Sequence, residues 1–167
     1  KKIKLIDNIN KNIGPSQSFS ILMSHSKNDY IMFCDQDDIW KKDKISKTLS
    51  EMKSKEKIFI DKPLLIHTDL TVVDENLRIL SKSFWRYQKI NPKRKKINQL
   101  LVQNVGTGCT MMINRKLLEL ICPLSKGIAM HDWWSVLVAT IFGEVIFLPL
   151  STIYYRQHDY NKIGASK

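Results

Sequence analysis

Apolar and polar positions divide the chain into short apolar runs and longer segments with apolar side chains at helical spacing. The apolar runs predict strands at residues 29–34, 63–74, 108–113, 144–150 and 152–158. The periodic segments predict helices at residues 15–27, 41–55, 95–102 and 114–121, and a loop followed by a helix at 127–143. Because helices alternate with strands that look buried on both faces, we expect an α/β fold with a mostly parallel central sheet flanked by helices.

The apolar spacing also predicts which helix faces are buried and where the chain turns. The expected buried faces are Phe19, Leu22 and Met23 on the first helix, and Ile45, Leu49 and Met52 on the second. Residues 74–77 are typical of a turn, and residues 80–94 of a surface excursion. Gly143 is expected to end the last helix.

Length and composition indicate one ordinary globular domain. The chain has 167 residues, 43% hydrophobic and 26% charged, and we expect a single domain over 1–167 with a loose polar tail at 159–167. Cys34, Cys109 and Cys122 lack the spacing of a metal site and are interpreted as reduced thiols of a cytosolic protein. No apolar run has the length of a membrane span, and no apolar stretch follows the first lysines as in a signal peptide.

The net charge of +11 is compatible with nucleic acid, an anionic membrane surface or phosphorylated substrates as partners. The lysines are spread along the chain, with one dense cluster at 92–96, PKRKK. Aromatic residues do not alternate regularly with the basic ones. We therefore favour a solvated basic surface and expect no nucleic-acid partner.

The sequence CDQDDIW at 34–40 places three carboxylates, Asp35, Asp37 and Asp38, directly after an apolar strand. Like charges at this spacing repel one another unless a cation lies among them. Ligands of α/β sheets bind beyond the carboxyl ends of the strands, and Mg²⁺ and Mn²⁺ prefer oxygen ligands. We expect a divalent metal here. The alternative is an acidic turn in which one Asp caps the helix that begins near Lys42.

Asp132 in the sequence MHDWWSVL has two interpretations that the residues alone leave equal. It can cap the helix that it opens, or it can act as a general base whose pKa is raised beside Trp133 and Trp134. The two tryptophans can equally be core residues. In the sequence YYRQH, the Arg156 guanidinium suits a phosphate or carboxylate, and His158 can join a metal shell or be an ordinary packed residue.

Two further segments carry polar or small residues that permit a ligand contact without requiring it. Gly106 and Gly108 in NVGTGCT would let the backbone approach a ligand, although a simple turn explains them equally well. His67 and Asp69 lie on one face of the strand LIHTDL, where a polar strand end is at least as good an explanation.

Together these segments resemble a family 2 glycosyltransferase, closest to the bacterial rhamnosyltransferase-like group of surface polysaccharide assembly. The resemblance rests, in order, on DYIMFCDQDDIWKKDKI, LLIHTDLTVVD, NVGTGCTMMINRKLL, HDWWSVLVATIFGEV and YRQH, from about Asn12 to about Gly164. It implies a GT-A fold whose first strand–helix–strand unit, which binds the base and ribose of the nucleotide, is missing from this chain. We accordingly expect an N-terminally truncated domain, uncertain activity for this chain alone, and a homodimer that covers the open sheet.

The resemblance also implies roles for individual residues. Asp35-Gln36-Asp37 would be the DxD motif that holds Mn²⁺ or Mg²⁺ against the diphosphate of the donor, with His158 completing the metal shell. Asp38 and Arg156 would lie at the donor, and Asp132 would be the catalytic base for an inverting transfer. Four residues would lie on the acceptor side: Gly108, His131, Trp133 and Trp134.

The implied partners are a dTDP- or UDP-linked sugar, with rhamnose as the suggested sugar, and a saccharide or lipid-linked acceptor. A cytoplasmic location follows, with peripheral association at the inner face of the membrane as a further expectation. The alternative function is a non-catalytic fragment that acts as a binding or assembly module. A metal-dependent phosphohydrolase would explain DQDD but not HDWW or the order of the segments.

Overall fold

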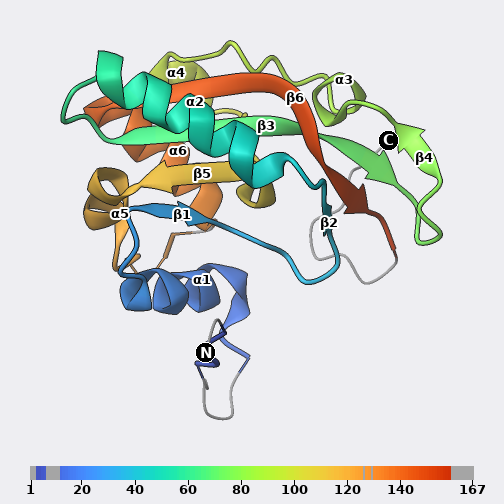
Figure 1. Ribbon diagram of the computed structural model, residues 1–167, viewed down its shortest axis with the longest axis horizontal. Helices are drawn as coiled ribbons and strands as arrows, with labels where there is room; N and C mark the ends of the chain where they lie inside the picture. Colours follow the sequence, from blue (N-terminus) through green and yellow to red (C-terminus); the bar gives the residue numbers. More distant parts are fainter. Residues whose placement is uncertain (1–2, 7–11, 126, 129, 159–167) are drawn as a thin grey trace.

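The computed structural model describes residues 3–6, 12–125, 127–128 and 130–158, so the tail predicted at 159–167 lies outside the described residues. Its centre is a six-stranded sheet in the order β1-β5-β3-β6-β2, with β4 paired to β3. The strands are β1 (Tyr30–Met32), β2 (Ile39–Trp40), β3 (Leu64–Val73), β4 (Ile79–Ser81), β5 (Met111–Asn114) and β6 (Glu144–Arg156). The long strands β3 and β6 run side by side through the middle of the molecule (Figure 1).

The α/β class is confirmed, but the expectation of a mostly parallel sheet is wrong. Among the described strands, β3 with β6 is the only parallel pair, and the other four pairs are antiparallel. An apolar run does not encode its own direction. The chain reverses between β3 and β5 through a long excursion, whereas the helices after β5 carry it back to begin β6 alongside β3.

The two late strands predicted from the sequence are one continuous strand, β6. Its register against β3 shifts after the pair Thr68–Leu148, and the next pair is Asp69–Ser151, so Pro149 and Leu150 have no partner on β3. Proline cannot donate a hydrogen bond to the ladder, and both unpaired residues are exposed. The apolar pattern shows the interruption but does not distinguish a bulge from a turn.

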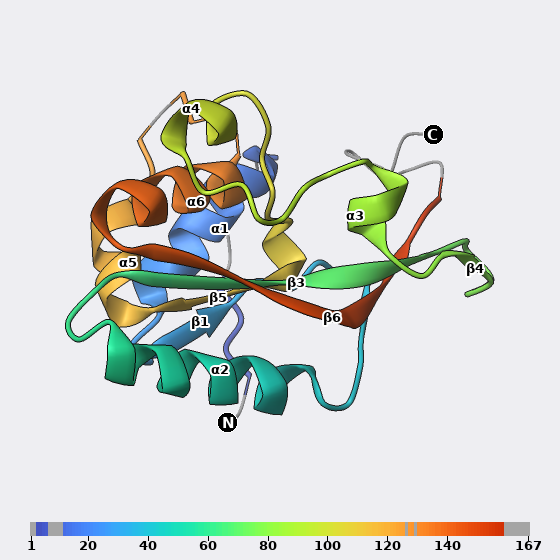
Figure 2. The same cartoon turned by 90° about the horizontal axis from the view of Figure 1, so that it is seen from above.

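Helices cover both faces of the sheet (Figure 2). One face carries α2 (Lys44–Ile58). The other carries α1 (Gly14–His25), α5 (Arg115–Ile121) and α6 (His131–Phe142), together with two short helices, α3 (Phe84–Tyr87) and α4 (Ile97–Leu100). A 3-10 turn, η1 (Gly108–Thr110), replaces the start of the strand that we predicted at 108–113.

Side chains on β3 alternate between the two cores, as a strand with both faces covered requires. Leu65 packs with the core under α1, α5 and α6, whereas Leu64 and Ile66 pack with Met52 of α2. The buried face of α2 differs from the predicted one. It consists of Lys44, Thr48 and Met52, and Ile45 is 54% exposed. Leu22 of α1 is likewise 49% exposed, although Met23 is buried as expected.

Gly143 ends α6, as predicted, and lets the chain pass close to the turn before β3. A Cβ atom at this position would lie 1.8 Å from the carbonyl oxygen of Pro63. The same oxygen accepts a hydrogen bond from Glu144 N at 3.0 Å, which begins the parallel pairing of β3 with β6. The central pair of strands therefore depends on a residue without a side chain at 143.

Candidate active site

The acidic cluster predicted from CDQDDIW lies in the turn between β1 and β2, and it faces η1. The potential ligand atoms of Asp35, Asp38 and Cys109 all lie within 4.8 Å of one another. Burial raises the pKa of Asp35, and the neighbouring Asp37 carboxylate raises it further. The turn therefore concentrates negative charge in a partly buried place, which favours a cation.

The end of β6 returns to this turn because β2 pairs with β6 through Ile39–Tyr154 and Trp40–Ile153. As a result Asp37 Oδ2 lies 2.9 Å from His158 Nε2. Asp38 Oδ1 accepts a hydrogen bond from the backbone N–H of Arg156 at 3.3 Å. The structure thus brings the sequence segments DQDD and YRQH together, and it pairs His158 with Asp37 rather than with Asp35.

Asp38 lies between Cys109 of η1 and the end of β6. Burial raises its pKa to about 6, although the nearby Cys109 thiol and the hydrogen bond from Arg156 N oppose this shift. Its second oxygen, Oδ2, is buried and has no hydrogen-bond partner among the described residues. Burial raises the pKa of Cys109 well above its ordinary value, so this side chain is a thiol at neutral pH.

Asp132 lies in the first turn of α6, but the helix cap is Met130, so Asp132 is not the capping residue. Its Oδ1 accepts a hydrogen bond from Trp133 N at 2.6 Å, and its Oδ2 accepts one from Gly108 N at 3.1 Å. Burial raises its pKa to about 6 against the effect of these two hydrogen bonds, and Asp35 adds a smaller increase. The hydrogen bond from Gly108 N links Asp132 to η1, whose next residue, Cys109, lies against the acidic cluster.

His131 and Gly108 fit closely against each other next to Asp132. A Cβ atom on Gly108 would lie 3.0 Å from His131 Nε2. The His131 ring stacks on Phe19 of α1 at a centroid distance of 4.1 Å and meets the edge of Phe33 at 5.0 Å. Burial lowers the pKa of His131 to about 4, so the imidazole is neutral at pH 7.

The comparisons with known proteins bear on this arrangement. The family model of glycosyl transferase family 2 matches residues 1–121, nearly three quarters of the chain and the part that contains the acidic cluster and η1. The chain belongs to this family. The mixed α/β sheet with helices on both faces agrees with the GT-A fold expected from the resemblance.

A curated relative of this family 2 chain is the dTDP-rhamnosyl transferase RfbG of Shigella flexneri. The two sequences are 24% identical over an alignment of 175 positions, which covers 98% of this chain. The alignment covers 56% of the relative, so the chain spans little more than half of the relative's length. Within the described residues, no helix is both long and apolar enough to cross a membrane.

The two tryptophans expected on the acceptor side make structural contacts in this family 2 domain. Trp133 Nε1 donates a hydrogen bond to the carbonyl oxygen of Leu100 at 2.6 Å, which ties α6 to α4. Trp134 packs, partly buried, against the core under α6. Both contacts suit the core interpretation that the sequence left open.

His67 and Asp69, the strand pair on β3, lie below α3. Asp69 accepts hydrogen bonds from the N–H groups of Phe84 (3.0 Å) and Trp85 (3.3 Å) and from Ser83 Oγ (2.5 Å). This carboxylate therefore fixes the start of α3. His67 is fully buried against the edge of Trp85, and burial lowers its pKa to about 4.

Lys44 is a residue of the site that sequence reasoning missed. It is fully buried, and its ammonium group has no hydrogen-bond partner among the described residues. Nζ lies 4.9 Å from the centroid of the Trp40 ring. Burial lowers its pKa to about 8, although Cys109, Cys34 and Asp38 favour the charged form. The available signal was a lysine at helical spacing with Thr48 and Met52, a pattern that the apolar residues Ile45 and Leu49 obscured.

The residues present fit a hard divalent cation. The cluster offers carboxylate oxygens, which Mg²⁺ and Mn²⁺ prefer, and one of them, Asp38 Oδ2, is buried without a described partner. The Cys109 thiol is a poor ligand for such a cation while it keeps its proton. Asp35 and Asp38 are therefore the carboxylates that the structure brings together to hold a metal, whereas Asp37 is not part of this group and contacts His158.

Proposed function

We propose that the chain forms the catalytic part of an inverting, metal-dependent glycosyltransferase that uses a nucleotide-diphosphate sugar. One observation supports this most strongly. Two consecutive residues of η1 connect the proposed base with the acidic cluster: Gly108 N donates a hydrogen bond to Asp132, and Cys109 Sγ lies within 4.8 Å of carboxylate oxygens of Asp35 and Asp38. A carboxylate able to act as a base thus lies across a single turn of backbone from the carboxylates able to hold a metal.

In the proposed reaction Asp132 takes the proton from an acceptor hydroxyl. The hydroxyl oxygen forms a bond with the anomeric carbon of the donor as the bond from that carbon to the diphosphate oxygen breaks, and the configuration inverts. A pKa of about 6 leaves Asp132 ionised at neutral pH yet more basic than an exposed aspartate. The N–H groups of Gly108 and Trp133 hold the carboxylate in one orientation.

The acidic cluster and the end of β6 would hold the donor. A cation bound there would offset the charge that develops on the leaving diphosphate. Asp35, Asp37 and His158 are the proposed ligands, and Asp38 Oδ2, which is buried without a partner among the described residues, is available as a further one. Asp38 and Arg156 are the proposed donor contacts, and they are already joined through Arg156 N.

The relative's name and the geometry of the site support a proposal for the substrates. The relative's name specifies dTDP-rhamnose as its donor type, so we propose a dTDP-linked sugar, with UDP-linked sugars as the alternative. We propose a saccharide or lipid-linked acceptor, with Gly108 and His131 nearest to it because they adjoin Asp132. We expect the reaction to occur in the cytoplasm, where nucleotide sugars are made and the three thiols stay reduced.

Calorimetric titration with dTDP and with UDP, each with and without Mn²⁺, tests the donor site. We expect nucleotide binding that requires Mn²⁺, with dTDP the tighter ligand. Absence of binding under all four conditions would contradict a donor site in this chain. The chain would then be better described as a non-catalytic module with the same fold.

Replacement of the base tests the chemistry separately from donor binding. We expect Asp132→Asn to keep metal-dependent nucleotide binding and to lose transfer by about 100-fold to 10,000-fold, the usual contribution of general base catalysis. Ser135→Ala, one turn further along α6, is the matched control and should retain transfer. Unchanged transfer in Asp132→Asn would remove Asp132 from the mechanism.

A further inference from the structure

One continuous segment of the chain is strongly basic and contains no acidic residue. Residues 82–96 include seven Lys or Arg side chains, and no Asp or Glu occurs between Glu75 and Glu119. The seven are Lys82, Arg86, Lys89, Lys93, Arg94, Lys95 and Lys96. The net charge of the protein is thus concentrated in the excursion between β3 and β5, which the proposed transfer chemistry does not use.

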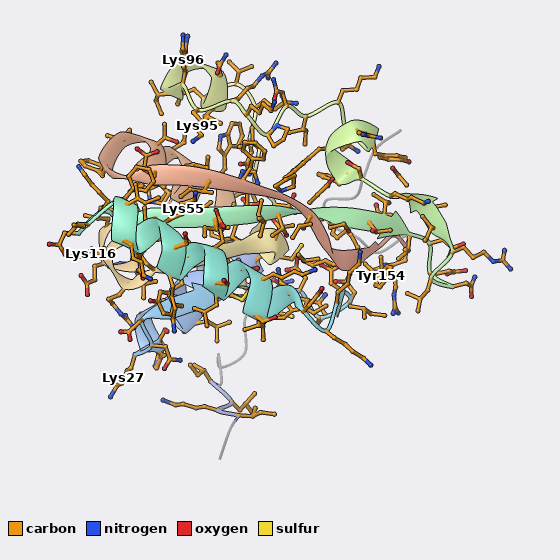
Figure 3. The ribbon with its side chains drawn as sticks, turned by 45° about the horizontal axis from the view of Figure 1, so that its top comes forward. Lys27, Lys55, Lys95, Lys96, Lys116 and Tyr154 are labelled. Atoms are coloured by element: carbon orange, nitrogen blue, oxygen red, sulfur yellow. The ribbon has the colours of Figure 1, made fainter. Side chains whose placement is uncertain are left out.

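This segment lies on one side of the molecule. α3 and α4 both lie above the sheet, on the side opposite α2 (Figure 2). Lys96 projects outward beside α4, away from Lys55 on α2 and from Lys27 (Figure 3), and Lys95 is also exposed. Among the described residues, no ion pair involves the seven basic side chains, and only Arg94 makes a side-chain hydrogen bond, to Gln103 Oε1 at 2.6 Å.

Exposed aliphatic side chains follow directly after the basic residues. Leu101 is 60% exposed, Val102 is 80% exposed and Ile97 is 38% exposed. The segment is held in this position, because Leu100 is fully buried and its carbonyl oxygen accepts the hydrogen bond from Trp133. The apolar side chains therefore point outward from a fixed backbone.

A hollow of about 660 Å³ lies at the α3 end of the same segment. Lys82, Arg86 and Lys89 line it together with the aromatic ring of Trp85. Asp69 also borders the hollow, but it accepts hydrogen bonds from the first residues of α3. The hollow thus presents three cations without an ion-pair partner among the described residues, which suits a phosphate group.

We propose that residues 82–102 form a docking face for the surface of an anionic phospholipid bilayer. Basic side chains attract anionic headgroups, and aliphatic side chains beside them enter the boundary between headgroups and acyl chains. Nucleic acid fits this face less well. The strongly exposed apolar side chains are aliphatic, and Trp85, whose ring lines the hollow, is only 9% exposed, so the face offers bases little aromatic surface on which to stack. This proposal does not depend on the transferase reaction.

Sedimentation with vesicles tests the docking face directly. The chain is mixed with vesicles of phosphatidylglycerol and phosphatidylethanolamine, and in parallel with vesicles of phosphatidylcholine alone. We expect binding to the anionic vesicles that weakens as salt rises, and little binding to phosphatidylcholine. Equal binding to both kinds of vesicle, or none to either, would overturn the proposal. So would retention by a short RNA without binding to anionic vesicles.

Two sets of substitutions separate the docking face from general charge. Lys93→Gln, Lys95→Gln and Lys96→Gln together should weaken binding at least tenfold and up to about 100-fold, at roughly fivefold per basic residue. The control set of Lys53→Gln, Lys57→Gln and Lys62→Gln removes the same charge from exposed positions on α2 and the turn after it, and should change binding less than about threefold.

The aliphatic side chains can be tested without a change of charge. Leu101→Ser with Val102→Ser should reduce the part of the binding that persists at high salt. Both side chains are exposed, so folding should be retained, which circular dichroism checks. If the substitutions at Lys93, Lys95 and Lys96 and the control substitutions at Lys53, Lys57 and Lys62 weakened binding equally, net charge alone would drive binding. The docking face would then be rejected.

Discussion

Asp132→Asn should stabilise the folded protein at neutral and higher pH while it removes the proposed base. Asp132 is 9% exposed, and burial raises its pKa from 3.8 to about 6. Because the folded protein binds this proton more tightly than the unfolded chain, the group's contribution to stability is full below pH 3.8. The contribution is lost as the pH rises through about 6.

The size of the effect follows from the shift and from one hydrogen bond. A shift of about two units corresponds to about 3 kcal/mol lost above pH 7, at about 1.36 kcal/mol per unit. Asparagine has one carbonyl oxygen, so it can accept from Trp133 N or Gly108 N but not from both, which costs about 1–2 kcal/mol at any pH. We therefore expect a net gain of about 1–2 kcal/mol at pH 8.

Urea unfolding of both proteins at pH 8 and at pH 4.5, with EDTA present, measures this difference. At pH 4.5 the ionisation of buried Asp132 costs the unmodified protein only about 1 kcal/mol of stability. The stability gained by Asp132→Asn should therefore be about 2 kcal/mol smaller than at pH 8, and it should reach zero or change sign. Ser135→Ala is the control, since it removes a buried hydrogen bond to His131 O without removing an ionisable group. Its effect should be the same at both pH values.

A difference between Asp132→Asn and the unmodified protein that stays within about 0.5 kcal/mol across this pH range would refute the reasoning. It would mean that burial does not raise the pKa of Asp132 in the folded protein. The case for a base at this position would then lose its electrostatic support, whatever the transfer assay showed.

Three further substitutions test the metal site, the central strands and the buried lysine. Asp37→Asn should weaken Mn²⁺ binding at least about tenfold by calorimetry, since it removes a carboxylate and its contact with His158; unchanged affinity would exclude Asp37 as a ligand. Gly143→Ala should cost about 3 kcal/mol or more in urea unfolding, because its Cβ would strike the backbone of Pro63; a loss below about 1 kcal/mol would contradict that packing. Lys44→Met should raise stability by about 1–3 kcal/mol at pH 7, because it removes a buried ammonium group. This advantage should disappear above pH 10.5, where Lys44 is neutral in both the folded and the unfolded protein. Lower stability of the variant at pH 7 would instead mean that the Lys44 charge stabilises the fold.

The elements with strong local signals could be predicted from the sequence. α1 begins at Gly14, one residue before the predicted start, Gly143 ends α6, and β1 and β3 begin and end within one or two residues of the predicted runs. These signals are local, because they depend on backbone preferences and on apolar spacing within a few residues. The candidate carboxylates could be found for the same reason: DQDD and HDWW stand out at the ends of apolar segments.

Side-chain burial was predicted less well where polar residues take core positions. Lys44 and Thr48 occupy the buried face of α2, whereas Ile45 is half exposed. Apolar spacing assumes that a helix buries its most apolar face. That assumption fails here because the start of α2 faces Trp40 of β2 and the turn that carries the acidic cluster, which together are not a uniformly apolar surface.

The sequence by itself determined where the longer helices and strands lie, that the negative charge is crowded into one turn, and that the chain resembles its family, whereas the short elements β2, β4 and α3 were not predicted. Only the tertiary structure decided the directions of the strands, the pairing of Asp37 with His158 across 121 residues, and the connection of Asp38 to Asp132 through η1. Local patterns depend on neighbours in the chain, whereas these contacts arise when β2 pairs with β6 and β5 pairs with β3. Such long-range pairing is specified by packing across the whole sheet and not by any one stretch of sequence.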